Sequence, residues 1–136
     1  MMNATAKIPI GASATKSIAV TPELTVAHFH PGMPAVYGTP MMIYHMELAA
    51  AAAIEPYLPD GWASVGAAVD VRHLAATPVG FTVTLRAKVL AVGDDTVTFA
   101  VEAHDGVEPI GVGTHVRVPI ELERFEKRVQ AKSLKR

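Results

Sequence analysis

The stretch that decides the fold is TPMMIYHMELAAAAA, which runs from Thr39 to Ala53. A threonine followed by a proline is a good helix start, because the hydroxyl can cap free amides and proline fits the first helical position. Alanine, leucine and methionine then propagate a helix well. We therefore expect one long helix from about Pro40 to Tyr57, ended by the prolines and the Asp-Gly turn that follow.

Glu47 is the only acidic residue in this stretch. An isolated carboxylate in an apolar helix is costly to bury unless it is paired or put to use. Glu47 is therefore the first candidate for a functional residue. The five alanines from Ala49 to Ala53 carry small side chains, which allow a curved sheet to approach the helix closely.

The chain after the helix alternates between apolar and polar residues with period two, which is typical of half-buried strands. We expect strands at 64–73, 81–91, 96–104 and 110–120, separated by turn residues. The apolar faces of these strands are predicted to carry Val65, Ala67, Val69, Val71 and His73; Phe81, Val83, Leu85, Ala87, Val89 and Ala91; Val97, Phe99, Val101 and Ala103; and Ile110, Val112, Thr114, Val116, Val118 and Ile120. A short strand is expected at Ser17–Val20, and the residues from Thr25 to Gly38 read as an irregular loop.

One apolar helix followed by four consecutive alternating strands predicts an α+β architecture, because the apolar face of the sheet needs the helix as its cover. This is the hotdog fold, in which an antiparallel sheet of about five strands wraps around one long central helix. We expect a single domain over residues 1–136, with loosely ordered ends at 1–15 and 130–136. A free edge strand invites pairing with a second copy, so a homodimer is predicted.

The composition excludes several classes of function. The net charge of −1 argues against nucleic acid as the main ligand, and the absence of cysteine excludes disulfides and thiolate chemistry. No segment reaches the roughly 20 apolar residues that span a membrane, and the N-terminus lacks the apolar core of a signal peptide. We therefore expect a cytoplasmic protein that does not bind membranes. The basic residues near the C-terminus read as a solvated end: Lys127, Arg128, Lys132, Lys135 and Arg136.

Several sequence clusters, in order, resemble the fluoroacetyl-CoA thioesterase-like family of hotdog enzymes. These are T-P-x-M at the helix start, M-E at Met46-Glu47, H-x-A-A-T-P-x-G from His73, and H-D-G-V-x-x-I-G-x-G-T-H from His104. The similarity runs from about Val36 to Val129. It implies an acyl-CoA thioesterase whose CoA thioester is the substrate, with no cofactor and no metal.

Matching positions carry the functional residues of that family onto this chain. The resemblance implies that Thr39, Glu47 and His73 are catalytic. It also implies that Gly66, His73 and Arg117 contact the thioester and CoA.

The chemistry of these residues suits the reaction. Thioester hydrolysis needs a nucleophile or an activated water, a proton donor for the thiolate, and donors for the carbonyl oxygen. Glu47 can serve as the nucleophile or the general base, and His73 can move protons near neutral pH. Thr39 and Glu47 cannot touch along a straight helix, because eight helical residues span roughly 12 Å. Either the first turn is irregular, or the site is assembled across a dimer seam, which we favour.

Other interpretations of the same residues stay open. Thr39 can be a plain helix cap, His73 a core histidine and Arg117 a surface arginine, while His104 and His115 read as structural. The histidines near the helix start, His28, His30 and His45, are not spaced with acids as a metal site requires.

Two other functions compete with the thioesterase. One is a non-catalytic acyl-CoA-binding hotdog protein, and the other is a hotdog hydratase or dehydratase, whose Asp/His motif is absent here. The segment from His30 to Gly38 is also shorter than the phenylalanine-bearing lid of family members that select fluoroacetyl groups. We therefore expect a short or medium acyl group.

Overall fold

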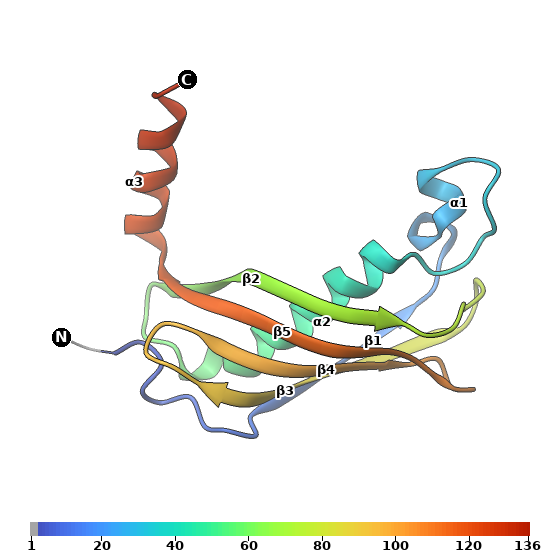
Figure 1. Cartoon of the computed structure of the whole chain (residues 1–136), viewed down its shortest axis with the longest axis horizontal. Coiled ribbons are helices and arrows are strands. Elements are labelled where there is room, and N and C mark those ends of the chain that lie inside the picture. The colour runs from blue at the N-terminus through green and yellow to red at the C-terminus, as the bar shows by residue number, and fades with distance from the viewer. Residues whose placement is uncertain (1–2) are drawn as a thin grey trace.

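A computed structural model describes residues 3–136 and shows one antiparallel sheet wrapped around a long helix (Figure 1). The sheet has the strand order β1-β3-β4-β5-β2. Its strands are β1 (Ser13–Ala19), β2 (Trp62–His73), β3 (Thr82–Val92), β4 (Val97–His104) and β5 (Pro109–Glu121). The long helix is α2 (Thr39–Ile54), continued by the short 3-10 helix η2 (Glu55–Tyr57). The predicted α+β hotdog fold is confirmed.

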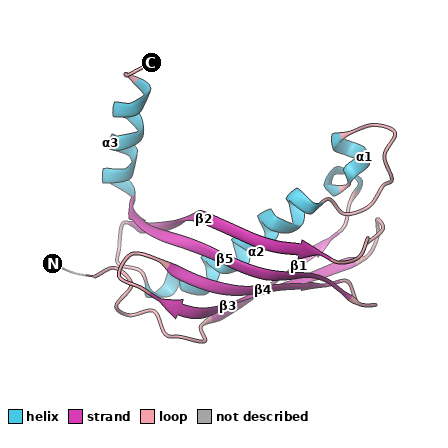
Figure 2. Ribbon diagram, in the orientation of Figure 1, coloured by secondary structure: helices cyan, strands magenta, loops and turns pink. Residues whose placement is uncertain are grey.

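Helix α2 lies across one face of the sheet, behind the strands in Figure 2. Gly38 is its N-cap and Pro40 lies in its first turn, so the chain enters the helix with a residue already held at helical φ. The methionines and alanines on its inner side are fully buried, mostly against β1 and β3. Contact with the sheet is tight at Gly111 of β5, where a Cβ atom would lie 2.5 Å from the sulfur of Met42.

The predicted faces of β3 and β4 are correct except at the two ends of the first, where Phe81 lies before β3 and Ala91 follows a register shift, and both are exposed. Their inward residues alternate strictly and are almost completely buried: Val83, Leu85, Ala87 and Val89, then Val97, Phe99, Val101 and Ala103. Burial of each of the larger side chains stabilises the fold by roughly 1.5–3 kcal/mol. These two strands form the apolar centre of the sheet.

The predicted faces of β2 and β5 are partly wrong. In β5 Ile110 and Ile120 are buried as predicted, but Gly111, His115 and Arg117 are buried as well, and Val112 is 47% exposed. In β2 a bulge between Gly66 and Ala68 shifts the register, so the face that begins with Ser64 and Gly66 continues with Val69, Val71 and His73. Simple alternation fails there because a bulge inserts one unpaired residue and moves the following side chains to the other face.

Short elements fill the segment before α2. The 3-10 helix η1 (Pro22–Leu24) and the single turn α1 (Val26–Phe29) lie within the region expected to be irregular, and β1 starts earlier than the predicted strand at Ser17–Val20. A bridge between Thr25 and Tyr37 closes the loop that follows α1.

Helix α3 (Leu122–Ser133) is an element that the strand pattern did not predict. It stands out from the sheet at the end of β5 and rises past the edge formed by β2 (Figure 1). Its side chains are solvated, as expected of the basic tail. The looseness of residues 1–15 and 130–136 stays a prediction, although β1 begins at Ser13 and α3 runs to Ser133.

Candidate active site

Thr39 and His73 form the first half of the candidate site. Thr39 is the first residue of α2 and His73 is the last residue of β2, and the Thr39 Oγ1 lies 2.7 Å from the His73 Nδ1. Thr39 does not cap the helix, because the N-cap position is occupied by Gly38 and Thr39 is already the first helical residue. The threonine hydroxyl is instead directed to the imidazole.

The imidazole of His73 lies in a partly buried environment beside the ring of Tyr37. Its ring lies edge-on to that of Tyr37, with 6.4 Å between the ring centroids. Its Nε2 is buried and has no hydrogen-bond partner among residues 3–136. Burial lowers the pKa of His73 from its ordinary value, and a backbone contact at Ala75 opposes this. His73 is therefore neutral near pH 7 and has a free ring nitrogen for a proton transfer.

A shallow hollow of about 370 Å³ opens beside this pair. Its lining is mainly apolar and comprises Val26, Val36, Tyr37, Thr39, His73, Leu74, Ala75 and Ala76. A small acyl group placed here would meet the threonine hydroxyl and the imidazole together.

A buried hydrogen bond that the sequence did not indicate helps to hold this half of the site. The Tyr37 hydroxyl is hydrogen-bonded to the His45 Nδ1 at 2.5 Å, and both side chains are buried. Burial raises the pKa of Tyr37 and lowers that of His45, so both groups are neutral. The pair fastens the residues before Thr39 to the second turn of α2.

The loop after His73 is anchored by the turn at the end of β4. The Thr77 hydroxyl donates to Asp105 Oδ2 at 2.9 Å, and Asp105 Oδ1 accepts the amides of Val107 and Glu108. The Thr77 carbonyl in turn accepts the Tyr37 amide at 2.8 Å. Burial alone would raise the pKa of Asp105, but these hydrogen bonds outweigh it and lower the pKa. The H-D-G-V cluster is thus a structural anchor for the Thr39–His73 half.

Glu47 forms the second half of the site with Gly66 and Arg117. The Glu47 Oε1 lies 3.4 Å from Arg117 Nη1, and a Cβ atom built on Gly66 would overlap that same oxygen. Gly66 therefore leaves the space that the carboxylate occupies. The Glu47 side chain is 34% exposed in the single chain, so the carboxylate is only partly buried.

Arg117 is 7% exposed, and all three of its guanidinium nitrogens have protein partners. Its Nε donates to Ser64 Oγ at 2.8 Å, and its Nη2 donates to the Ser64 carbonyl at 2.7 Å. Its Nη1 faces both Glu47 and the Nε2 of His115, the latter at 3.2 Å. Burial lowers the pKa of Arg117, and the Glu47 carboxylate opposes this.

His115 takes part in the site as a neutral acceptor. Arginine can only donate, so the His115 Nε2 accepts from Arg117 and the proton sits on Nδ1, which donates to the Ala68 carbonyl at 2.8 Å. Burial also lowers the pKa of His115. The 3.9 Å approach of His115 to Glu47 is therefore not an ion pair.

The structure keeps the two halves apart within one chain. Helix α2 is a regular α-helix from its first residue, so an irregular first turn does not bring Thr39 to Glu47. Gly66 and His73 are seven positions apart along β2, which corresponds to roughly 23 Å. The single chain thus contains two half-sites, Thr39–His73 and Glu47–Gly66–Arg117.

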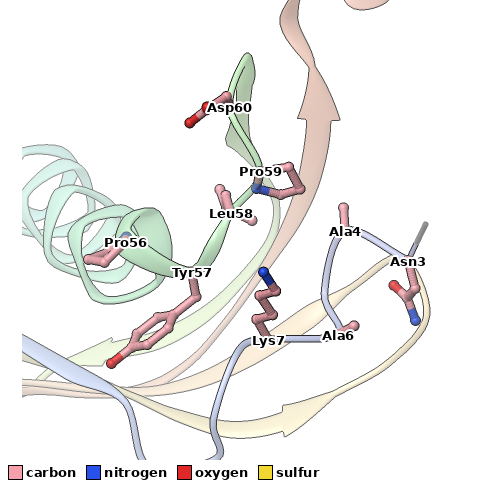
Figure 3. Close-up of a pocket in the computed structure, with 9 residues that line it drawn as sticks. All are labelled: Asn3, Ala4, Ala6, Lys7, Pro56, Tyr57, Leu58, Pro59 and Asp60. Atoms are coloured by element: carbon pink, nitrogen blue, oxygen red, sulfur yellow. The ribbon is translucent and has the colours of Figure 1, made fainter.

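A larger hollow of about 410 Å³ lies at the other end of α2, between the N-terminal residues and η2 (Figure 3). It is lined by Asn3, Ala4, Ala6, Lys7, Pro56, Tyr57, Leu58, Pro59 and Asp60, and it includes none of the candidate catalytic residues. Within residues 3–136, no group of three or more His, Asp or Glu side chains is placed to hold a metal ion, and no helix is long and apolar enough to cross a membrane.

Comparison with known proteins shows the family of the chain. The profile of the fluoroacetyl-CoA-specific thioesterase family matches residues 20–123. The fluoroacetyl-CoA thioesterase of Streptantibioticus cattleyicolor is 41% identical over 130 residues, which cover 91% of this chain and 94% of that protein. The chain belongs to this family. It is therefore a thioester hydrolase.

Solved structures agree with this assignment. A variant of the fluoroacetyl-CoA-specific thioesterase FlK, in complex with fluoroacetate and CoA, superposes with a TM-score of 0.80 at 41% identity, over 86% of this chain and 98% of that chain. A hot-dog-like protein from Thermanaerovibrio acidaminovorans superposes with a TM-score of 0.87 at 26% identity, over 96% of this chain and 97% of that chain.

Proposed function

We propose that this family member hydrolyses a short or medium acyl-CoA thioester to the free acid and CoA, and that it does so as a homodimer. The contact of the Glu47 carboxylate with Gly66 and Arg117 supports the proposal most directly. The Glu47 carboxylate is a charged group on an otherwise apolar helix, and the adjacent position of β2 is a glycine, Gly66, which leaves room for it. No cofactor or metal is needed, and the cytoplasmic location stays a prediction.

The chemistry divides between the two half-sites. Hydrolysis adds the oxygen of water to the acyl carbon, breaks the C–S bond and delivers a proton to the sulfur. Glu47 serves as nucleophile towards the acyl carbon or as general base for the water. His73 moves the proton, with Thr39 Oγ1 on its Nδ1.

The start of α2 offers a donor for the thioester oxygen. The amides of Met41 and Met42 both bond to the Gly38 carbonyl, whereas the Thr39 N–H has no hydrogen-bond partner among residues 3–136. An amide at a helix N-terminus favours developing negative charge, and it would stabilise the oxyanion of the tetrahedral intermediate.

The free edge of β2 supports a homodimer. Within residues 3–136, β2 pairs with β5 alone, and its stretch from Gly66 to Asp70 is exposed with the apolar Ala67, Ala68 and Val69 in it. An unpaired apolar edge of this kind invites a second strand. Antiparallel pairing about a two-fold axis between Val69 and Asp70 would set Gly66 opposite the partner's His73. That register would join Glu47 of one protomer to the Thr39–His73 pair of the other.

The hollow beside Thr39 and His73 supports a small acyl group. Its walls are short segments at the start of α1, the start of α2 and the end of β2. A panel of acyl-CoA thioesters of increasing length, with fluoroacetyl-CoA included, tests the substrate by release of free CoA.

Loss of turnover with Glu47→Gln tests the thioesterase against a non-catalytic acyl-CoA-binding protein. We expect CoA release to fall at least a hundredfold while the far-UV circular dichroism stays unchanged. Full turnover by the folded variant would mean that Glu47 is not the catalytic acid.

Mixing two inactive variants tests assembly across the seam. Glu47→Gln chains and His73→Ala chains are unfolded together, refolded together and assayed. If the halves come from different subunits, each mixed dimer carries one intact site, and about a quarter of the wild-type activity returns. If the mixture stays inactive although mixed dimers form, the halves act within one chain.

A further inference from the structure

His115 is a buried histidine that carries out no step of the proposed reaction. It lies on β5 with 1% of its surface exposed, and its ring stacks on that of Phe99 in β4, with 6.1 Å between the ring centroids. In the proposed reaction, Glu47 and His73 supply the nucleophile or base and the proton carrier. A buried polar ring costs free energy unless its hydrogen bonds are made, so the partners of His115 decide what it does.

The two partners of the His115 ring fix one tautomer. Nδ1 lies 2.8 Å from the Ala68 carbonyl, which can only accept, so Nδ1 carries the proton. Nε2 lies 3.2 Å from Arg117 Nη1, which can only donate, so Nε2 is the acceptor. Ala68 is the first paired residue after the bulge in β2. The ring therefore connects the bulge of β2 to the guanidinium on β5.

The acceptor on His115 helps to determine where one end of the guanidinium points. Arg117 Nη1 lies 3.2 Å from His115 Nε2 and 3.4 Å from Glu47 Oε1. The other two nitrogens of Arg117, Nε and Nη2, are bonded to Ser64. Glu47 is the mobile partner of Nη1, because its side chain is 34% exposed and ends a flexible arm. His115 is the rigid partner, because its ring is packed and bonded at both nitrogens.

A proton on Nε2 of His115 would reverse this contact. Two N–H groups that belong to like charges would then face each other across 3.2 Å, and the guanidinium would be pushed away. The Glu47 Oε1, at 3.9 Å, would be the acceptor for the new N–H group. The carboxylate would therefore exchange an arginine partner for a histidine partner.

The surroundings of the His115 ring favour its neutral form. The charged groups that face it are Glu47 from α2 and Arg117 from its own strand. The neighbouring strands present uncharged groups, which are the Phe99 ring of β4 and the Ala68 carbonyl of β2. Burial is the main cause that lowers the pKa of His115, so the ring is neutral near pH 7.

We propose that His115 is a positioning residue for the hydrolysis: protonated on Nδ1 alone, it directs the Arg117 guanidinium to the Glu47 carboxylate, and a second proton on Nε2 turns this half-site off. The inference rests on the proposed function, because it takes Glu47 as a participant in the reaction. The four groups involved lie in one chain, so the arrangement does not depend on how two subunits meet.

Two replacements of His115 separate its acceptor from the bulk of its ring. His115→Gln retains an oxygen that can accept from Arg117 and an amide that can donate to the Ala68 carbonyl, whereas His115→Leu has neither. Near neutral pH we expect kcat to fall about tenfold in the leucine variant and to stay within about threefold of wild type in the glutamine variant, with little change in KM. Equal losses of kcat in the two variants would overturn the proposal.

The effect of His115 should pass through Arg117. In an Arg117→Ala background, His115→Leu removes an acceptor that no longer has its donor, so we expect kcat to change by less than about twofold. A tenfold loss in that background as well would mean that His115 acts by another route, and would overturn the proposal. Thermal melting shows whether each variant is folded at the temperature of the assay.

The pH profile of kcat/KM identifies the second proton. Protonation of Glu47 and His73 also contributes to the acid limb, so the wild type and His115→Gln are compared directly. Glutamine does not titrate, so we expect a less steep limb in the variant, which should keep about threefold more of its neutral activity at pH 5. Superimposable acid limbs would show that a proton on His115 does not control the site, and would overturn the proposal.

Nitrogen NMR tests the same arrangement without turnover. Long-range ¹H–¹⁵N spectra should show a His115 ring that is protonated on Nδ1 alone near neutral pH, with His115→Gln identifying its signals. The Nε2–H tautomer would overturn the proposal even in a protein that hydrolyses acyl-CoA. If the wild type hydrolyses no acyl-CoA but the Nδ1–H tautomer is found, and Arg117 signals shift as His115 titrates, the thioesterase proposal fails and the His115–Arg117 contact stands.

Discussion

Arg117 is the residue whose position differs most from what its place in the sequence suggests. It alternates off the run of valines in β5, which reads as a solvated face, yet it is buried beneath α2 beside Glu47. His115 and Arg117 occupy helix-facing positions of β5 beside Glu47, whereas Gly111 lets the core residue Met42 approach the strand. The geometry favours a role for Arg117 in holding the Glu47 carboxylate.

Replacement of Arg117 tests this role. Arg117→Ala leaves Glu47 and the Ser64 carbonyl without a donor, so we expect the free energy of unfolding to fall by about 2 kcal/mol and kcat to fall by at least tenfold. Arg117→Lys keeps the charge but loses the forked geometry, and should recover part of both. Denaturant unfolding and steady-state kinetics measure these effects. A rise in KM alone would point instead to a phosphate contact.

Gly66→Ala is expected to displace the Glu47 carboxylate. The added methyl group would overlap Glu47 Oε1 and approach the His115 ring at 3.3 Å. Because the end of a side chain can move, we expect the fold to persist with a change in Tm of only a few degrees, while kcat falls by at least tenfold. In a Glu47→Ala background the overlap disappears. An undiminished effect of Gly66→Ala on Tm there would show that the glycine serves the backbone.

At the scale of elements, the site depends on where α2 and β2 end. Thr39 begins the helix and His73 ends the strand, so the position of both relies on the loops that join them to the rest of the chain. The Thr77–Asp105 bond and the bond from the Tyr37 amide to the Thr77 carbonyl tie these loops together. Thr77 is completely buried, which makes this connection sensitive to a single hydroxyl.

Thr77→Val removes that hydroxyl at nearly constant volume. We expect the free energy of unfolding to fall by about 1–2 kcal/mol, because a buried carboxylate loses a donor, and kcat to fall because the His73 loop loosens. Thr77→Ser retains the hydroxyl and is the matched control. Equal kcat values for the valine variant and the wild type would show that the Thr77–Asp105 hydrogen bond does not affect catalysis.

At the scale of the whole molecule, the buried His45 and His115 and the half-buried His73 link stability to pH. Burial lowers the pKa of His45, His73 and His115 below the ordinary value of 6.5. The unfolded chain therefore binds protons that the folded chain does not, in the range below pH 6.5. Stability is complete above that pH and declines as the pH falls towards the folded-state pKa values.

Melting curves between pH 8 and pH 5 measure this linkage. We expect Tm to be constant above about pH 7 and to drop by several degrees by pH 5. His45→Leu removes one of the three titrating groups, so its Tm should depend less steeply on pH. A Tm that stays constant down to pH 5 would mean that the three histidines titrate alike in the folded and unfolded chains.

The sequence by itself determined the helix, the central strands and the identity of the residues to examine. The long apolar run after Thr39 and the alternation in β3 and β4 are local patterns, because each residue there is chosen for one face of its own element. Motif matches likewise singled out Thr39, Glu47, Gly66, His73 and Arg117. The structure brings each of them into one of two half-sites.

Only the tertiary structure decided which of these residues meet. The bulge after Gly66 turns the rest of β2 over, and the burial of Arg117 and His115 follows from the approach of α2 to β5. The Tyr37–His45 and Thr77–Asp105 contacts join residues through the packing of different elements, and Thr77 and Asp105 are 28 residues apart in sequence. Such contacts depend on register and on the distance between elements, and a pattern confined to one element contains neither quantity.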